Sequence, residues 1–475
     1  MKVKLSKYLA SKENELEALI STLSEHYKYA SILGSDTNGK SYDVSRRGSS
    51  INDSFWAERG FVVRVFNGIN YSEYSFNELP KNQDIIIEAI NKIAKEDVEL
   101  LKKKDIEFFG YPLIDENEIE EDFEGEVDVI PNTISPEEKI NRLSKIMNDA
   151  LKLSELLIDY RVSYEEVHIS KVFYSTKKKL SQSILYTTAS EVAIVKREND
   201  IKYAYESKSG LKGFEILDEL GMAEGLISKA VELLDAGKVV PGTYDIICDP
   251  AVAGLIAHEA FGHGVEMDMF VKNRAKGEEY VGKKIASDKV MMKDGALSAQ
   301  EVGTYLFDDE GTLGTDTTII EDSILLTGIS DLLSALKLGT KPTGNGRRES
   351  YQRKAYARMT NTFFGTGEDS LDDMIASIDD GYLLESYNSG MEDPKNWGIQ
   401  CAIARGREIK NGKLTGKVVA PVMMTGYVPD LLESISMVSK DHFELSGSGA
   451  CGKGHKEWAK TSTGGSYIKA VGRLG

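Results

Sequence analysis

Apolar residues recur every three or four positions in several stretches of the chain, which is the spacing of an amphipathic helix. The helices predicted in this way are residues 11–32, 81–103, 135–158 and 221–236. One of them opens with Ser135, Pro136 and Glu138, the combination typical of a capped helix start.

Other stretches are enriched in Val, Tyr, Ile and Thr and predict strands. A valine-rich run before Asn67-Gly68 predicts a hairpin within residues 60–73. Longer strands are predicted at 162–174, 183–195 and 202–206. Such strands form a broad sheet, whose edge is either protected or open to an extended peptide that adds as one more strand.

The pattern changes after Val239-Val240-Pro241-Gly242, where a boundary is expected. A strand at 243–248 follows, and from about residue 275 short glycine-punctuated strands dominate, including a hairpin turning at Asn411-Gly412. The predicted fold is α+β: an N-terminal α/β region with a large antiparallel sheet, then a mostly-β C-terminal domain. A chain of 475 residues exceeds one hydrophobic core, and the expected domains are residues 1–130, 131–238 and 239–475.

Composition places the chain among ordinary soluble proteins, with 41% hydrophobic and 28% charged residues. Its apolar runs reach about seven residues, whereas a membrane span needs about 20, and the polar N-terminus does not resemble a signal peptide. The net charge of −18 argues against general nucleic-acid binding. Three cysteines are too few for a disulfide framework and indicate a reducing cytoplasm; Cys248 and Cys401 are expected in the core.

The main candidate for chemistry is a helix that begins at Asp249-Pro250 and runs into His258, Glu259 and His263. The spacing H-E-x-x-x-H is one residue longer than the zinc-protease motif H-E-x-x-H. In a regular helix the two histidines would therefore diverge. Either a one-residue π-bulge or an end of the helix before His263 would realign them, and Gly262 permits both. The side that carries Glu259 and His263 is expected to be buried.

A catalytic zinc site needs three protein ligands and one open position. Cys451 lies between glycines at 447–454 and is a candidate for the third ligand. A buried, inert thiol is the alternative for Cys451. Glu266, Asp268 and His455 are rival ligands, and the chemistry of these residues alone does not choose among them.

Four stretches of the chain together resemble the TldD/PmbA family of metalloproteases, closer to the TldD branch because the PmbA (TldE) branch typically lacks H-E-x-x-x-H. These stretches are residues 258–266, 344–348, 358–362 and 447–453. The resemblance covers nearly the whole chain and is most specific from about residue 240 onward.

The resemblance implies that His258, His263 and Cys451 hold zinc while Glu259 acts on its water, so that peptide bonds in unstructured peptides are hydrolysed. It also implies a dimer, either of two copies or with a PmbA/TldE-like paralogue. A thiolate ligand makes zinc a weaker Lewis acid, so modest turnover is expected. The alternative is a non-catalytic, zinc-stabilised assembly subunit. No substrate-binding residue is assigned.

Three further charged groups have two interpretations each. The acidic stretch 115–128 is expected to be an exposed connection, although it could also select cationic substrates. Asp308-Asp309-Glu310 is expected to form a solvated turn and not a second metal site. Arg347, Arg348 and Arg358 are expected to form structural salt bridges, with binding of a substrate carboxylate as the alternative.

Overall fold

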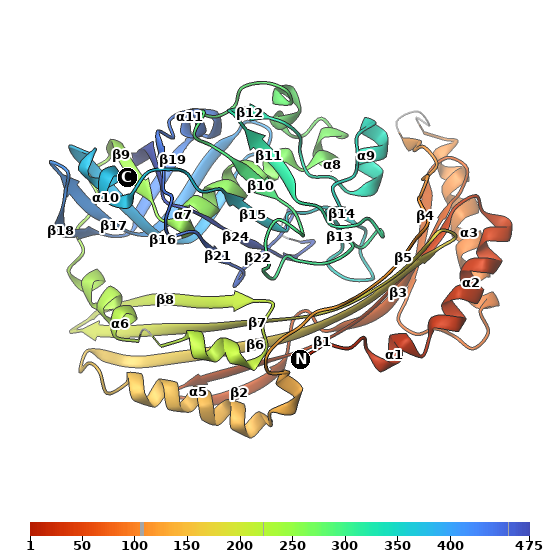
Figure 1. Cartoon of the computed structure of the whole chain (residues 1–475), viewed down its shortest axis with the longest axis horizontal. Coiled ribbons are helices and arrows are strands. Elements are labelled where there is room, and N and C mark those ends of the chain that lie inside the picture. The colour runs from red at the N-terminus through yellow and green to blue at the C-terminus, as the bar shows by residue number, and fades with distance from the viewer. Residues whose placement is uncertain (105–108, 222, 455) are drawn as a thin grey trace.

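The computed structural model describes residues 1–104, 109–221, 223–454 and 456–475. Figure 1 shows two halves: an N-terminal half built on one long curved sheet, and a C-terminal half of smaller sheets and short helices above one end of it. None of the described helices is long and apolar enough to cross a membrane.

The N-terminal half is one eight-stranded sheet within the described residues, in the order β4-β3-β1-β6-β7-β5, with β2 paired to β1 and β8 to β7. All its pairings are antiparallel except β5 with β7. Its strands are β1 Ala30–Ser45, β2 Gly48–Asp53, β3 Glu58–Phe66, β4 Tyr71–Phe76, β5 Ile119–Glu124, β6 Leu157–Ser175, β7 Lys178–Arg197 and β8 Asp200–Gly210. Strands β1 to β5 precede residue 130 and β6 to β8 follow it, so the predicted domains 1–130 and 131–238 share one sheet.

Helices cover this sheet at both ends (Figure 1). At one end α1 Lys7–Ala10, α2 Glu13–His26 and α3 Asp84–Leu101 bury leucines and isoleucines against β1 and β3. At the other end α5 Pro136–Ala150 and α6 Ala223–Glu232 enclose a second core against β6 and β7. The short 3-10 turns of this half are η1 Pro131–Thr133, η2 Phe214–Glu219 and η3 Leu233–Asp235.

The C-terminal half contains a seven-stranded sheet, ordered β16-β9-β25-β19-β17-β18 with β20 on β25, and a six-stranded sheet, ordered β12-β11-β10-β15-β24-β21, among the described strands. The strands of the first are β9 Gly242–Cys248, β16 Asp380–Glu392, β17 Gly398–Lys410, β18 Lys413–Val419, β19 Val422–Tyr427, β20 Met437–Val438 and β25 Ile468–Leu474. Those of the second are β10 Met292–Asp294, β11 Thr317–Glu321, β12 Ile324–Leu325, β15 Asn361–Phe364, β21 Glu444–Ser446 and β24 Ser462–Gly465.

Two small hairpins and several short helices complete this half. The hairpins pair β13 Gly346–Arg347 with β14 Tyr356–Ala357, and β22 Ala450–Cys451 with β23 Ala459–Lys460. The helical segments are α7 Pro250–Leu255, η4 Ile256–Gly262, η5 His263–Val265, α8 Met267–Phe270, η6 Lys276–Tyr280, α9 Leu332–Leu338, α10 Leu371–Ala376 and α11 Val428–Glu433. Helix α7 lies between the two larger sheets, and the largest core surrounds it.

The predicted α+β class, the large antiparallel sheet and the β-rich C-terminal half are confirmed. The capping box at Ser135 and Glu138 is present, and the hairpin at Asn411-Gly412 has both residues at positive φ. Cys248 and Cys401 are fully buried, as expected.

The predicted helix 11–32 was too long, because α2 ends at His26 and β1 begins at Ala30. Strand β1 was missed because its glycines suggested a turn. Gly34 and Gly39 instead allow close packing: a Cβ at Gly34 would lie 2.9 Å from the Phe61 ring. The predicted helix 135–158 likewise ends early, at Ala150.

The acidic stretch was expected to be an exposed connection, but its central part is strand β5. Ile119 and Phe123 are partly buried, while the three acidic residues between them, Glu120, Glu121 and Asp122, are exposed along the sheet edge. Lys179 on the neighbouring strand lies 3.9 Å from the carboxylate of Glu120 in β5. Cross-strand pairing with lysine-bearing β7 therefore gives this like-charge stretch a regular structure.

The expectation of a solvated turn at 308–310 was wrong, since all three carboxylates are buried. Asp309 and Glu310 belong to a charged cluster between the two halves, here called the interface cluster: Arg64, Glu73, Lys171, Asp309, Glu310 and Arg348. Arg64 lies 2.6 Å from Glu310 and 2.7 Å from Glu73. Arg348 binds both Glu73 oxygens, and Lys171 pairs with Asp309.

We expect Arg64→Met to lower the free energy of unfolding by about 3–5 kcal/mol, because it leaves the Glu310 carboxylate buried without its cation. Urea denaturation measures the change. Lys92→Ala is the matched control, since its pair with Glu96 is exposed and is worth less than about 1 kcal/mol. Equal losses in the two variants would contradict a role for the interface cluster.

The same cluster predicts acid sensitivity. Burial would raise the pKa of Glu73, but the charges of Arg348 and Arg64 outweigh it and hold that pKa well below its usual range. A carboxylate with a lowered folded-state pKa stabilises the fold at neutral pH, and this contribution is lost as pH falls below about 4. Glu73→Gln should therefore flatten the stability–pH curve on the acid side, as measured by thermal melts from pH 3 to pH 7.

Candidate metal centre

The helix that carries the H-E-x-x-x-H motif begins as its sequence predicts. The Val252 backbone N–H donates to the Asp249 carboxylate at 2.8 Å, and Pro250 occupies the first turn of α7. The other Asp249 oxygen accepts from the Ser386 N–H at 2.9 Å, which ties the helix start to β16. Burial raises the pKa of Asp249 to about 6 although both backbone donors lower it.

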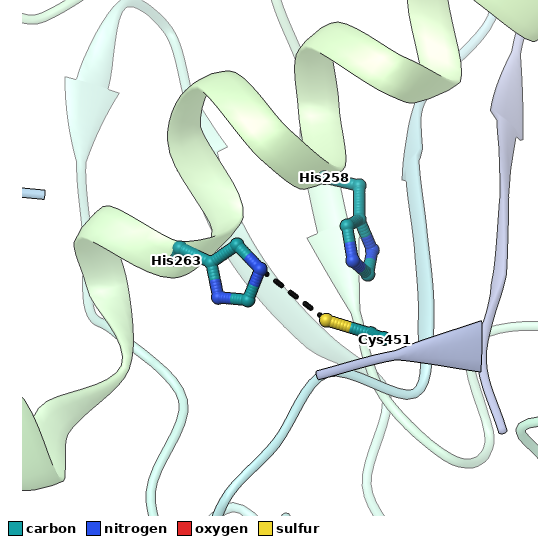
Figure 2. A group of neighbouring side chains, drawn as sticks. All are labelled: His258, His263 and Cys451. Atoms are coloured by element: carbon teal, nitrogen blue, oxygen red, sulfur yellow. Dashed lines mark hydrogen bonds between the residues drawn. The ribbon is translucent and has the colours of Figure 1, made fainter. Parts of the chain in front are cut away.

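The histidine spacing is accommodated by a π-helix, the first of the two remedies expected. Segment η4 continues α7 with wider turns, and the His263 N–H donates to the His258 carbonyl five residues earlier. This i→i+5 bond places the second histidine one π-turn after the first. Both imidazoles consequently lie on the same side of the helix, as Figure 2 shows.

Two glycines let the rest of the domain approach the motif helix closely. A Cβ at Gly254 would lie 2.4 Å from the Gly464 nitrogen of β24, and a Cβ at Gly262 would lie 2.2 Å from the Met359 sulfur. A larger side chain at Gly254 would collide with the backbone of β24, and one at Gly262 would displace the Met359 side chain. These contacts fix the position of the histidines relative to the sheet beneath them.

Cys451 reaches the histidines from a separate hairpin, β22–β23. Its sulfur lies 3.2 Å from His263 Nε2, and one ligand atom from each of His258, His263 and Cys451 lies within 4.8 Å of the others. Figure 2 shows the three side chains converging. Among the described residues no other His, Cys, Asp or Glu group offers three such ligands.

The donor set fits a zinc ion. Two imidazoles and a thiolate are ligands that zinc prefers, and His258 Nδ1 is buried with no hydrogen-bond partner. Burial by itself would raise the pKa of the Cys451 thiol. The charges of His258, His263 and Arg358 outweigh burial and lower this pKa well below its ordinary value. Burial likewise opposes protonation of His263, but Cys451 and Glu266 raise its pKa. The cysteine is thus already favoured as a thiolate, the form that binds metals.

Glu259 lies beside both imidazoles. Its carboxylate oxygens are 3.9 Å from His258 Nε2 and 3.9 Å from His263 Nε2. Its side chain is 25% exposed, so the expectation of a fully buried side holds for Val252 and Ile256 but not for this carboxylate. A base that faces both the ligands and solvent can exchange protons with an incoming molecule.

The rival ligands Glu266 and Asp268 have other partners. Glu266 accepts from His263 Nδ1 at 3.2 Å and from Arg358 Nε at 3.2 Å. Asp268 pairs with Lys453 at 2.6 Å, which ties the glycine-rich loop to the motif segment. His455, the third rival, lies outside the described residues. Glu266 therefore orients His263, and Asp268 holds the loop that carries Cys451 through Lys453.

Of the three arginines, Arg348 and Arg358 form the salt bridges expected. Arg347 instead donates to the Met359 carbonyl at 2.8 Å and stacks over the Tyr305 ring.

Sequence reasoning missed Glu392 on β16. Burial raises its pKa to about 9, although His263 acts in the opposite direction, and both its oxygens are buried without a hydrogen-bond partner. Its first oxygen would lie 3.1 Å from a Cβ at Gly264, next to His263. No local motif marks this glutamate, because only the packing of β16 on the motif helix brings it there.

Comparison with known proteins gives consistent results. Residues 241–469 match the PmbA/TldA metallopeptidase C-terminal domain. A metalloprotease of Methanocaldococcus jannaschii is 30% identical over 332 residues, which are 68% of this chain and 71% of that protein. A zinc metalloprotease TldD homologue of Saccharolobus solfataricus is 28% identical over 430 residues, 88% of this chain and 89% of that protein. A metalloprotease of Methanothermobacter thermautotrophicus is 31% identical, and the match spans 62% of this chain and 65% of the relative.

Solved structures share the fold. TldE from Thermococcus kodakarensis superposes with a TM-score of 0.71 at 19% identity, covering 96% of this chain and 99% of that one. A proposed modulator of a DNA gyrase from Thermotoga maritima gives a TM-score of 0.76 at 18% identity, covering 97% and 100%. At such identities the likeness concerns the fold alone.

We expect the purified protein to contain one zinc ion per chain, and His258→Ala and Cys451→Ala to lose it. Cys248→Ala is the control for the loss of a buried thiol, because Cys248 lies in the core and not in the candidate ligand group. Zinc content by plasma mass spectrometry, together with the melting temperature before and after chelation, measures the effect. Full zinc content in Cys451→Ala would exclude the sulfur as a ligand.

Proposed function

Because this chain belongs to the TldD/PmbA family of metallopeptidases, we propose that it hydrolyses peptide bonds, with zinc held by His258, His263 and Cys451 and with Glu259 as general base. The observation that carries this proposal is the position of the Glu259 carboxylate, 3.9 Å from a nitrogen of each histidine. In the hydrolase mechanism, the base must lie next to the metal ligands and within reach of water.

Zinc, when bound, supplies a Lewis acid that polarises the scissile carbonyl and acidifies a water molecule. Glu259 takes the proton of the attacking water and passes it to the leaving amine, a role typically worth about 10²–10⁴-fold in rate. Strand β16 restrains this side chain, since a Cβ at Gly390 would lie 2.9 Å from Glu259 Cγ. The base is thus held from one side and open to solvent on another.

The proposed substrates are unstructured peptides, bound in extended form. In the described part of the chain β8 pairs with β7 alone, so its other edge has no strand partner. Figure 1 shows β8 along the edge of the N-terminal sheet that faces the C-terminal half. An extended peptide added along that edge would be recognised through its main chain.

A dimer in the cytoplasm is part of the same proposal, formed by two copies or with a PmbA/TldE-like paralogue that lacks the motif. The three cysteines are free and buried, which fits a reducing compartment. The fold is shared with TldE from Thermococcus kodakarensis.

A zinc-stabilised assembly subunit would need a fourth protein ligand that closes the coordination sphere. Within the described residues the candidate group has three members, and Glu266 and Asp268 are paired with cations instead. The pairing of Glu266 and Asp268 with cations, together with the position of Glu259 beside both imidazoles, favours the hydrolase over the assembly subunit.

We expect Glu259→Gln to keep its zinc and to lose peptide cleavage by about 10²-fold or more. Mass spectrometry of cleaved unstructured peptides, with zinc content measured on the same samples, provides the test. Glu224→Gln is the control, because Glu224 is exposed on α6 and remote from the metal centre. Retained zinc with no cleavage by the wild-type protein, alone or with its paralogue, would favour the assembly subunit.

A further inference from the structure

Arg358 is a fully buried arginine that contacts the proposed zinc ligand Cys451 directly. Its side chain is 1% exposed, and its Nη2 donates to the Cys451 sulfur at 2.8 Å. Its Nε donates to Glu266 at 3.2 Å, and its Nη1 donates to the Glu457 carbonyl. The guanidinium therefore joins the metal hairpin to the segment that follows the motif helix.

The backbone of Arg358 is itself fixed. Its N–H donates to the Asn345 carbonyl at 2.9 Å, and the Asn345 side chain donates to the Arg358 carbonyl at 3.0 Å. All the polar groups in this chain of contacts are buried. A planar guanidinium held at both ends has little freedom to leave the sulfur.

Glu266 extends the connection to a second ligand, because its other oxygen accepts from His263 Nδ1. One arginine thus contacts the thiolate directly and a histidine through a carboxylate. Lys453 neutralises the extra carboxylate charge, at 3.2 Å from Glu266 and 2.6 Å from Asp268. Groups that hydrogen-bond metal ligands set both the orientation and the donor strength of those ligands.

We propose that Arg358 is a positioning residue of the metal centre, which holds the Cys451 sulfur towards the two histidines and draws negative charge from it. A thiolate is the ligand that would most weaken the Lewis acidity of zinc. An N–H donor from a cation offsets this, because it stabilises the sulfur lone pairs that would otherwise be donated to the metal. Arg358 thereby lets a cysteine bind zinc in a catalytic site while the zinc keeps enough Lewis acidity for hydrolysis.

This inference rests on the proposed zinc hydrolase, and cobalt substitution tests it separately from activity. In the Co(II)-loaded protein, the thiolate-to-cobalt charge-transfer band reports the energy of the sulfur lone pairs. In Arg358→Met we expect this band to move to longer wavelength, because the sulfur loses its donor. In Arg358→Lys, which keeps the charge but not the planar fork, a smaller shift is expected.

With the zinc enzyme, we expect Arg358→Met to lower kcat by about 10–100-fold with little change in KM, and Arg358→Lys to recover part of the loss. Arg405→Met is the matched control. Arg405 is a buried arginine of the same half whose ion pairs are with Glu232 and Glu385 and not with any of the three candidate ligands. In the Co(II)-loaded Arg405→Met variant, the charge-transfer band should stay at the wild-type position.

An unshifted band in both Arg358 variants would overturn the proposal. If Arg358→Met does not fold, the lysine variant decides: a shifted band supports the role and an unshifted band rejects it. A wild-type protein that shows the band but cleaves no peptide would refute the hydrolase while leaving the role of Arg358 towards Cys451 supported by the band shift. A wild-type protein without any thiolate band would contradict both the ligation of the metal by Cys451 and the role of Arg358.

Discussion

The arrangement of the metal centre depends on one backbone feature, the π-turn between His258 and His263. A regular helix would direct these imidazoles apart, whereas the i→i+5 bond from His263 to the His258 carbonyl brings them to one side. The sulfur of Cys451, 188 positions after His263, lies 3.2 Å from His263 Nε2. Wide turns of this kind are costly, and here the close packing permitted by Gly254 and Gly262 holds the helix in place.

A centre of this kind also has an electrostatic requirement, because several charged groups are buried together. The thiolate, Glu266 and Asp268 carry negative charge, and Arg358 and Lys453 carry the compensating positive charge at hydrogen-bond distance. Without these cations, burial would favour the neutral forms of the thiol and the carboxyl groups. The ion network therefore keeps the cysteine available as a metal ligand while it fixes the two chain segments that carry the ligands.

The sequence was informative where a local pattern has one structural solution. The helix cap at Asp249 and the capping box at Ser135 each led to the structure observed. The histidine spacing left two backbone solutions, of which the structure has the π-turn. It was misleading where glycine or acidic residues suggested loops: Gly34 and Gly39 lie inside β1, and Asp309 and Glu310 are buried against Lys171 and Arg64. Those outcomes depend on partners far away in the chain, which no window of sequence contains. Glu392 was missed for the same reason, and the convergence of Cys451 was expected through family resemblance rather than through its spacing.

The segment from β13 to β14 connects the N-terminal sheet to the metal centre. Arg348 leaves β13 to bind Glu73 on the N-terminal sheet, and Tyr351 packs so closely on β3 that a Cβ at Gly60 would lie 2.2 Å from its ring. Arg358, directly after β14, donates to the Cys451 sulfur. The same short hairpin thus contacts the proposed peptide-binding half at one end and the proposed zinc ligand at the other. Both contacts are buried ion pairs or charge-assisted bonds, so this hairpin links the N-terminal sheet to the segment that supports the metal centre.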